Sequence, residues 1–519
     1  MHLPILPLLA PFIAGVLLLA LPNLPMPVRR RIATFAVCVQ IAIAGALLAA
    51  TGGGDILVYR LGDWPAPWGI VLVADRLAAW LVLITTLLAL FAVIHAGDGA
   101  DRRGRHFHVL FQMQLFGIAG AFLTGDLFNL FVFFEILLIA SYGLLLHGGG
   151  AQRTRAGLHY VVLNLLGSTV FLFAAGLIYA ALGTLNMADI ASRAARVSPE
   201  NLGLARAGGL LLFAVFALKA ALLPLFLWLP AAYANTAAPV AALFAIMTKV
   251  GAYALLRADA LLFGPASGPL AGLFAPWLLP LALATLGAGM LGALAADSLR
   301  RLAAWLVIAS VGTLLTAFAL GTHDVVGGIA AGLYYLPHGT FAAALLFLLA
   351  EGIARRRPAS ADSFAPCIDM PRHALWGGLF FAAAVAAAGL PPLSGFLGKF
   401  MILRAAQGHP AQAWIWGVLL VAALAGVIAL ARAGSRLFFS TRTVEAAHAA
   451  PQEAPIDRLP DEPPDPPSAP RELTAILGLL GLILALTVAA GPAHDFTRAA
   501  AAQLADPAAY IAAVLGGSP

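Results

Sequence analysis

Residues 210–230 read LLLFAVFALKAALLPLFLWLP, an apolar run that contains one lysine, Lys219, and two prolines, Pro224 and Pro230. A bilayer hydrocarbon core of about 30 Å needs about 20 apolar residues for one helical crossing. Runs of this kind recur along almost the whole chain. Because 61% of the 519 residues are hydrophobic and only 10% are charged, too few polar side chains exist to coat a soluble globule of this size. The sequence therefore predicts an all-α integral membrane protein.

Apolar runs bounded by charges or by Pro/Gly clusters predict about fourteen transmembrane helices. The predicted segments are near residues 4–22, 32–50, 73–96, 106–123, 127–146, 158–182, 208–229, 236–256, 273–295, 302–320, 325–350, 373–403, 412–431 and 473–491.

The arginines test this helix count, because cytoplasmic loops of membrane proteins are enriched in Lys and Arg. If the N-terminus is outside, the loops that become cytoplasmic carry more than twice as many arginines as the opposite loops. We therefore expect an inner (plasma) membrane protein of bacterial type, multi-pass, with both termini outside. The basic residues lie in short clusters without a basic face, so we expect no nucleic-acid partner.

Residues 443–472 differ from the rest of the chain, since they are rich in proline and acids and poor in large apolar side chains. This composition predicts a solvated, extended cytoplasmic linker before the last helix. The tail after Pro492 predicts at most a short interfacial helix.

Lysine occurs only at positions 219, 249 and 399, and each position lies inside an apolar segment, whereas the loops use arginine throughout. Arginine stays protonated in proteins, whereas a buried lysine can lose its proton. A charge at the bilayer centre costs about 3 kcal/mol on insertion scales, so we interpret the three lysines as proton carriers. The alternative is that each lysine pairs with an acid or caps a broken helix end.

Glu135, in TGDLFNLFVFFEILLIASYGLL, is the one acid near the middle of a predicted crossing. A carboxylate there must be protonated or paired. We expect Lys219 to be its partner, either as a switchable pair or as a fixed structural ion pair.

Prolines well inside two lysine segments predict broken helices. Pro224 follows Lys219, and Pro391 and Pro392 precede Lys399. Paired interruptions in the two halves of a transporter point to inverted repeats with a site near the membrane midplane, although simple kinks are the alternative. Pro337 predicts a third interruption, and the adjacent His338 is either a proton link between the halves or a core histidine.

These residues resemble a known family, the antiporter-like membrane subunits shared by respiratory complex I and Mrp-type (Pha-type) cation/proton antiporters. The resemblance rests on FNLFVFFEI, on the K-x4-P-x3-WLP run from Lys219, on the KVGAYALLR block from Lys249, and on GLPPLSGFLGKF ending in Phe400. The GDWPAPWGIVLVADRL block is most similar to the D-type subunits of the Mrp/Pha antiporters.

The resemblance implies helices 1–3 in residues 1–105, a first repeat of helices 4–8 in residues 106–257, and a second, inverted repeat of helices 9–13 in residues 273–432. Helix 14 and a tail then occupy residues 473–519, and helices 7 and 12 are the broken ones. It also implies proton transfer by five residues, which are Glu135, Lys219, Lys249, His338 and Lys399.

The leading hypothesis is a proton-translocating subunit of a multisubunit Na⁺(K⁺)/H⁺ antiporter, with other subunits of that complex as partners and no enzymatic activity. A proton-pumping subunit of a complex I type NADH-quinone oxidoreductase is the alternative, and a structural scaffold with fixed ion pairs is a third. No Rossmann glycine fingerprint, P-loop or CxxC array occurs, so we expect no cofactor and no metal site.

Overall fold

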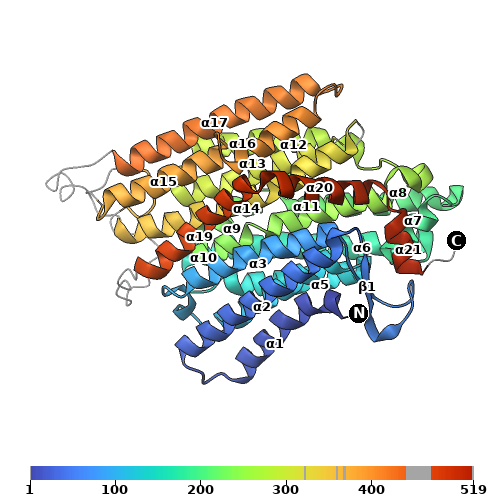
Figure 1. The fold of residues 1–519 in the computed structure, drawn as a ribbon, viewed down its shortest axis with the longest axis horizontal. Helices are drawn as coiled ribbons and strands as arrows, with labels where there is room; N and C mark the ends of the chain where they lie inside the picture. The colour runs from blue at the N-terminus through green and yellow to red at the C-terminus, as the bar shows by residue number, and fades with distance from the viewer. Residues whose placement is uncertain (1, 321–322, 358–359, 366–369, 440–468, 517–519) are drawn as a thin grey trace.

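The computed structural model describes residues 2–320, 323–357, 360–365, 370–439 and 469–516. Long helices lie side by side along the long axis of the molecule, and both termini lie at the same end (Figure 1). In the described residues, 12 helical spans are long and apolar enough to cross a membrane, and two shorter apolar helices, Phe107–Leu123 and His373–Ala388, lie among them. Together they match the predicted helix count, and an even number of crossings explains why the termini share one end.

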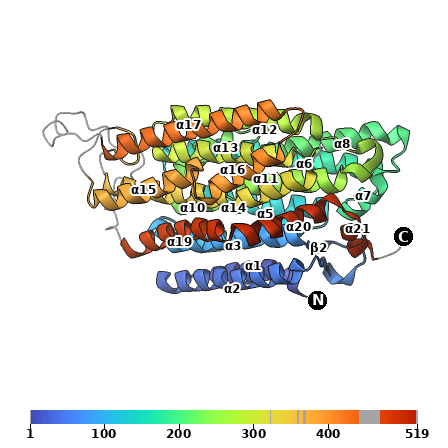
Figure 2. The same ribbon diagram turned by 45° about the horizontal axis from the view of Figure 1, so that its top comes forward.

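Helices α1 and α2 of the N-terminal part lie together at one edge of the bundle (Figure 2). The helices of the N-terminal part and of the first half of the chain, residues 106–257, are α1 (Leu6–Ala20), α2 (Met26–Gly52), α3 (Arg76–Ala96), α4 (Phe107–Leu123), α5 (Leu127–Leu145), α6 (Ala151–Leu182), α7 (Met187–Ala194), α8 (Pro199–Ala220), α9 (Trp228–Asn235), α10 (Ala238–Phe244) and α11 (Met247–Arg257).

The second half, residues 273–432, and the C-terminal part complete the bundle. The helices are α12 (Ala275–Ala295), α13 (Leu299–Phe318), α14 (Val325–Arg356), α15 (His373–Ala388), α16 (Ser394–Ala405), α17 (Gln412–Phe438), α19 (Ala469–Val488), α20 (Ala490–Ala505) and α21 (Ala508–Leu515).

A small β-hairpin departs from the all-α prediction. Strands β1 (Leu57–Arg60) and β2 (Val71–Ala74) pair antiparallel, with Leu57 opposite Ala74 and Arg60 opposite Val71. The intervening GDWPAPWG sequence supplies the glycines and prolines of a chain reversal. The hairpin precedes α3 and lies outside the transmembrane spans.

Both predicted helix breaks are present. α8 ends at Ala220 and the chain becomes helical again at Trp228, while α15 ends at Ala388 and α16 begins at Ser394. Pro224 lies in the first gap, and Pro391 and Pro392 lie in the second. A further interruption, which was not predicted, separates α10 from α11 shortly before Lys249.

The predicted interruption at Pro337 is wrong, because α14 runs from Val325 to Arg356 with Pro337 inside it. A proline removes the hydrogen bond to the carbonyl four residues earlier, which is that of Leu333. The indole nitrogen of Trp80, on α3, donates to this Leu333 carbonyl at 3.1 Å. The freed acceptor is therefore satisfied within the protein, as the membrane interior requires, and the helix continues.

The C-terminal part is more extensive than predicted. The linker prediction falls mostly on residues outside the described ones, and residues 469–472 already belong to α19. Helix α20 follows α19 after a one-residue step and packs along α14 and α3 (Figure 1). The predicted interfacial tail is thus a packed helix, α20, followed by α21, which packs on α7.

Ion pairs between loops and helix ends show which helix ends lie at the same end of the bundle. Ion pairs join Arg30 to Asp101, Arg300 to Glu351, and Arg356 to Glu472. These residues all come from loops or helix ends that the arginine bias assigned to one side, and we call this set the arginine-rich end. At the opposite end, Arg257 pairs with Asp75, as the alternation of the predicted crossings requires.

Candidate functional site

Lys219 lies in the last turn of α8, immediately before the break. Its side chain is buried, and two residues later Ala221 adopts a left-handed conformation with φ of 60° that ends the helix. The lysine therefore lies where the helical backbone gives way to an irregular segment inside the membrane.

The polar backbone groups freed by this break find partners within the protein, as a segment inside the bilayer requires. The indole nitrogen of Trp228 donates to the carbonyl of Leu218 at 3.2 Å. The backbone N–H of Leu223 donates to Oγ1 of Thr285 at 2.9 Å. Thr285 belongs to α12. A hydroxyl of the second half therefore accepts the hydrogen bond of a backbone N–H that the helix break in the first half leaves free.

Lys219 and Glu135 are joined through two polar side chains of α6. The ammonium nitrogen of Lys219 donates to Oδ1 of Asn164 at 3.1 Å, and the hydroxyl of Ser168 donates to the carboxylate of Glu135. Asn164 and Ser168 are one helical turn apart and are themselves linked, because Ser168 Oγ also lies 3.0 Å from the Asn164 carbonyl, a second acceptor for its hydrogen. Among the described residues no ion pair joins Lys219 to Glu135 directly, so the expected contact is indirect.

Asn164 and Ser168 were not predicted as site residues, although a signal was present in the sequence. Both polar residues interrupt the apolar run VVLNLLGSTVFL at a spacing of four. This spacing places them on one face of a helix, where polar side chains in a transmembrane segment hydrogen bond to neighbouring helices.

Lys249 lies on α11 and is completely buried. In the part of the chain that the structure describes, its amine has no hydrogen-bond partner. Two residues further on, Gly251 lies so close to the backbone of Lys219 and Ala220 that a Cβ would collide with the Ala220 nitrogen. The Lys249 helix thus packs directly on the end of the Lys219 helix.

Lys399 lies on α16, after the second break. Its amine donates to the carbonyl of Ala388 at 2.8 Å, which is the last residue of α15. This contact is the helix-capping role that the sequence left open as an alternative. Lys399 differs in this respect from Lys219, whose partner is a side chain.

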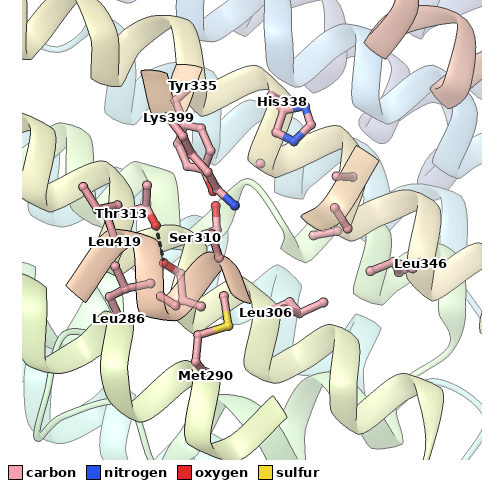
Figure 3. Close-up of a pocket in the computed structure, with 17 residues that line it drawn as sticks. Leu286, Met290, Leu306, Ser310, Thr313, Tyr335, His338, Leu346, Lys399 and Leu419 are labelled. Atoms are coloured by element: carbon pink, nitrogen blue, oxygen red, sulfur yellow. Dashed lines mark hydrogen bonds between the residues drawn. The ribbon is translucent and has the colours of Figure 1, made fainter. Parts of the chain in front are cut away.

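His338, on α14, faces the start of α16. Its Nδ1 atom lies 3.0 Å from the hydroxyl of Ser394, and Gly395 lies against the ring so closely that a Cβ would collide with Nε2. His338 and Lys399 both line a cavity of about 30 Å³, together with Ser310, Thr313 and Tyr335 (Figure 3). The structure therefore brings these two predicted site residues together.

Five predicted site residues thus form two groups. Glu135 and Lys219 are connected through α6, with Lys249 on the adjoining helix, and His338 and Lys399 share a cavity in the second half. No group of three or more His, Cys, Asp or Glu side chains could hold a metal ion within the described residues. The arrangement is one of single titratable groups spaced by neutral polar side chains.

At the arginine-rich end, Asp101 forms a buried ion pair outside the membrane spans. Arg30 donates to both carboxylate oxygens, at 2.6 and 2.7 Å, and His108 Nε2 lies 3.1 Å from one of them. Burial by itself raises the pKa of Asp101, but the hydrogen bonds from Arg30 and His108 outweigh burial and hold the pKa below its usual value. The carboxylate stays charged and ties α2 to α4.

Comparison with known proteins assigns this pattern of buried residues to a family. A family profile described as "NADH:quinone oxidoreductase/Mrp antiporter, TM" matches residues 124–428, a range that includes all five predicted site residues. The chain belongs to this family. The D-type subunit of a probable K(+)/H(+) antiporter from Rhizobium meliloti is 39% identical, over 99% of this chain and 97% of the relative. The D-type subunit of the Na(+)/H(+) antiporter of Alkalihalophilus pseudofirmus is 34% identical, over 99% of both chains.

Solved structures agree with this membership in the NADH:quinone oxidoreductase/Mrp antiporter family. A chain of the Mrp complex from Dietzia sp. DQ12-45-1b matches with a TM-score of 0.82 and 27% identity, over 99% of both chains. A chain of respiratory complex I from Thermus thermophilus matches with a TM-score of 0.76 over 97% of this chain, at 23% identity. The complex I likeness concerns the fold alone, and it identifies the bundle as the antiporter-like fold of that complex.

Proposed function

We propose that this chain is a proton-translocating subunit of a multisubunit Na⁺(K⁺)/H⁺ antiporter, a transporter subunit rather than an enzyme. Protons move through Glu135, Lys219, Lys249, His338 and Lys399. The observation that carries the proposal is the connection from the Lys219 ammonium through Asn164 and Ser168 to the Glu135 carboxylate.

The side chains that join Lys219 to Glu135 can keep their hydrogen bonds when either residue gains or loses a proton. A lysine amine can be protonated or neutral when it is removed from water, and an amide oxygen can accept from the charged form without ionising itself. The hydroxyl of Ser168 can both donate and accept. Glu135 and Lys219 therefore influence each other's charge without being fixed in a direct ion pair.

Two similar units support a paired pathway. Residues 106–257 contain a broken helix with Lys219, and residues 273–432 contain a broken helix with Lys399. We assign these ranges to two inverted repeats, with Lys249 and His338 between the two lysines. Inverted repeats place the working residues near the membrane midplane, at the interface of the units.

Relatives of similar length support monovalent cation/proton exchange and the partners. Subunits named for K(+)/H(+) and for Na(+)/H(+) antiport both match nearly the whole chain, which favours antiport over a redox-driven complex I role. The partners are then the other membrane subunits of an Mrp-type complex.

The orientation follows from the arginines. Because Lys and Arg are enriched in cytoplasmic loops, the arginine-rich end faces the cytoplasm of a bacterial cell and both termini lie outside. Reporter fusions at the C-terminus test this orientation, since an alkaline phosphatase fusion is active only outside the plasma membrane.

The deciding experiment measures cation-driven recovery of a ΔpH dye in vesicles that contain the assembled complex. We expect Lys219→Ala and Glu135→Ala each to abolish the exchange. Arg206→Ala is the matched control, because Arg206 is also basic and on α8 but is solvent-exposed, with its guanidinium on the Pro269 carbonyl. Normal exchange by either site variant, in complexes assembled to the normal level, would overturn the proposal.

A further inference from the structure

Lys399 and His338 line one cavity in the second half of the chain (Figure 3). Its volume is about 30 Å³, and since one water needs about 10–15 Å³ of such volume, it has room for about two water molecules. Three hydroxyl side chains, those of Ser310, Thr313 and Tyr335, share its wall. The cavity is therefore both large enough and polar enough to hold water.

The hydroxyl of Ser310, on α13, has no role in the hydrogen bonds described so far. The side chain is buried, and its Oγ forms no hydrogen bond of standard geometry with any residue that the structure describes, although the hydroxyl of Tyr335 lies beside it. A buried polar group that lacks a partner costs about 1–3 kcal/mol, so this hydroxyl needs a partner inside the cavity. Ser310 and Lys399 line the same cavity (Figure 3).

Gly339 keeps the space around this hydroxyl open. A Cβ at position 339 of α14 would collide with Oγ of Ser310. Glycine has a helix propensity about 1 kcal/mol below that of alanine, so it is an unfavourable choice within a helix. Here it lets α13 and α14 approach while Ser310 still faces the cavity.

Three further polar groups line the cavity near Ser310, and each has a more restricted role. The hydroxyl of Tyr335 lies against the hydroxyls of Ser310 and Thr313. Thr313 Oγ1 donates its hydrogen to the carbonyl of Ala309 at 3.0 Å, the bond drawn in Figure 3, so it can only accept from a cavity water. The amine of Lys399 already donates to the Ala388 carbonyl and has further hydrogens to offer. Ser310 is left as a hydroxyl that can accept from Lys399 or water and donate to water.

We propose that Ser310 is a positioning residue that holds water between Lys399 and His338, an inference that rests on the proton pathway proposed above. One proton leaves the Lys399 ammonium for a cavity water, and that water gives a different proton to the His338 imidazole. The water is regenerated and no other bond changes.

The two halves of the chain thus use different connections. In the first half, Asn164 and Ser168 fill the space between lysine and glutamate with side chains. In the second half, Ser310 and its cavity leave room for water. Replacing Ser310 by valine removes the water's partner, whereas threonine has the shape of valine and keeps the hydroxyl.

The experiment compares Ser310→Val with Thr316→Val in vesicles that contain the assembled antiporter complex. Thr316 is the matched control, because it is also a buried hydroxyl on α13 but donates within the helix to the Gly312 carbonyl at 2.8 Å and does not line the cavity. We expect Ser310→Val to slow exchange by at least about tenfold, given that positioned proton-transfer groups contribute about 100-fold or more. Ser310→Thr, which keeps the hydroxyl, retains most of the rate.

The ratio of exchange rates in H₂O and D₂O separates positioning from damage to the fold. If the relay is impaired, proton transfer becomes the slow step and the ratio rises in Ser310→Val, whereas misassembly lowers both rates equally. An unchanged ratio, or a rate equal to that of Thr316→Val, overturns the role of Ser310. Lys399→Ala is measured in parallel: if it exchanges normally, the proposed pathway fails, and if it is inactive while Ser310→Val is normal, only this inference fails.

Discussion

The ammonium of Lys219 donates to Oδ1 of Asn164 at 3.1 Å, and not to the carboxylate of Glu135. Glu135 instead accepts from Ser168, one helical turn further along α6. The charged groups of the first half are therefore held apart by a neutral amide and a hydroxyl. A direct ion pair would fix both charges, whereas this arrangement lets each group change its protonation state while its neighbour keeps a hydrogen bond.

Removing the hydroxyl of Ser168 tests this connection. We expect Ser168→Ala to slow cation/proton exchange by about tenfold, because a hydrogen bond to a charged group contributes about 1.5–3 kcal/mol. Thr169→Ala is the control, since Thr169 also bonds the carbonyl four residues earlier, at 3.1 Å from Leu165, but is exposed. Equal rates in the two variants would show that Ser168 does not take part.

Gly395 fixes the position of His338. A Cβ at Gly395 would collide with Nε2 of His338, so Gly395→Ala displaces the imidazole from its position in the cavity even though alanine favours helix. We expect the exchange rate to fall by roughly 10- to 100-fold, because misplacing a reacting group by about 1 Å can lower a rate by that much. Gly417→Ala, on α17 where a Cβ meets nothing within 4 Å, is expected to exchange normally, and a normal rate for Gly395→Ala would contradict this role of the glycine.

The contact between Thr285 and the first break contributes to stability. Thr285→Val leaves the N–H of Leu223 without its acceptor, at a cost of about 1–3 kcal/mol for a buried group. We expect a lower thermal unfolding temperature of the purified complex. Thr340→Val, which removes a buried hydroxyl bonded only within its own helix to Leu336, should have a smaller effect; if the two shifts are equal, the contact across the halves is not stabilising.

The Asp101 ion pair predicts a pH dependence at the arginine-rich end. Because Arg30 and His108 hold the pKa of Asp101 below its unfolded value, which is about 3.9, the stabilisation is complete above about pH 4 and is lost as the pH falls through the lower, folded pKa. We expect Asp101→Asn to destabilise the protein at pH 7 by about 3 kcal/mol, as for a broken buried pair.

Thermal unfolding scans between pH 3 and pH 7 check this prediction. The difference between wild type and Asp101→Asn should shrink at the acid end of the range. Asp297→Asn is the control, because the pair of Asp297 with Arg301 is largely exposed and exposed pairs contribute little. A difference that persists unchanged at pH 3 would show that charge is not the cause.

The sequence predicted the helices well because each crossing needs its own apolar run, and such runs can be counted without any knowledge of tertiary contacts. The breaks near Lys219 and Lys399 were predictable for the same reason, since a proline removes a hydrogen bond locally. Pro337 shows the limit of local prediction. Whether a proline breaks a helix depends on which group bonds the freed carbonyl, and Trp80 comes from a helix more than two hundred residues away.

The partners of the buried charges could not be predicted from spacing. Lys219, Asn164 and Glu135 lie on α8, α6 and α5, and only the packing of these helices decides which side chains meet. The cavity beside Ser310 is likewise a product of packing, because it depends on Gly339 and on the approach of α13 to α14. Residue types can indicate that a group is buried, but not which space is left beside it.

The confinement of lysine to the membrane interior makes side-chain amines a chemical reporter of that interior. No loop carries a lysine, and the amines at 219, 249 and 399 lie within or beside the two broken spans and α11. A water-soluble amine-reactive reagent can therefore modify a lysine of the folded chain only where water itself reaches the proposed pathway. Mass-spectrometric mapping of the modified lysines, with and without an imposed pH gradient, would show which half opens and when.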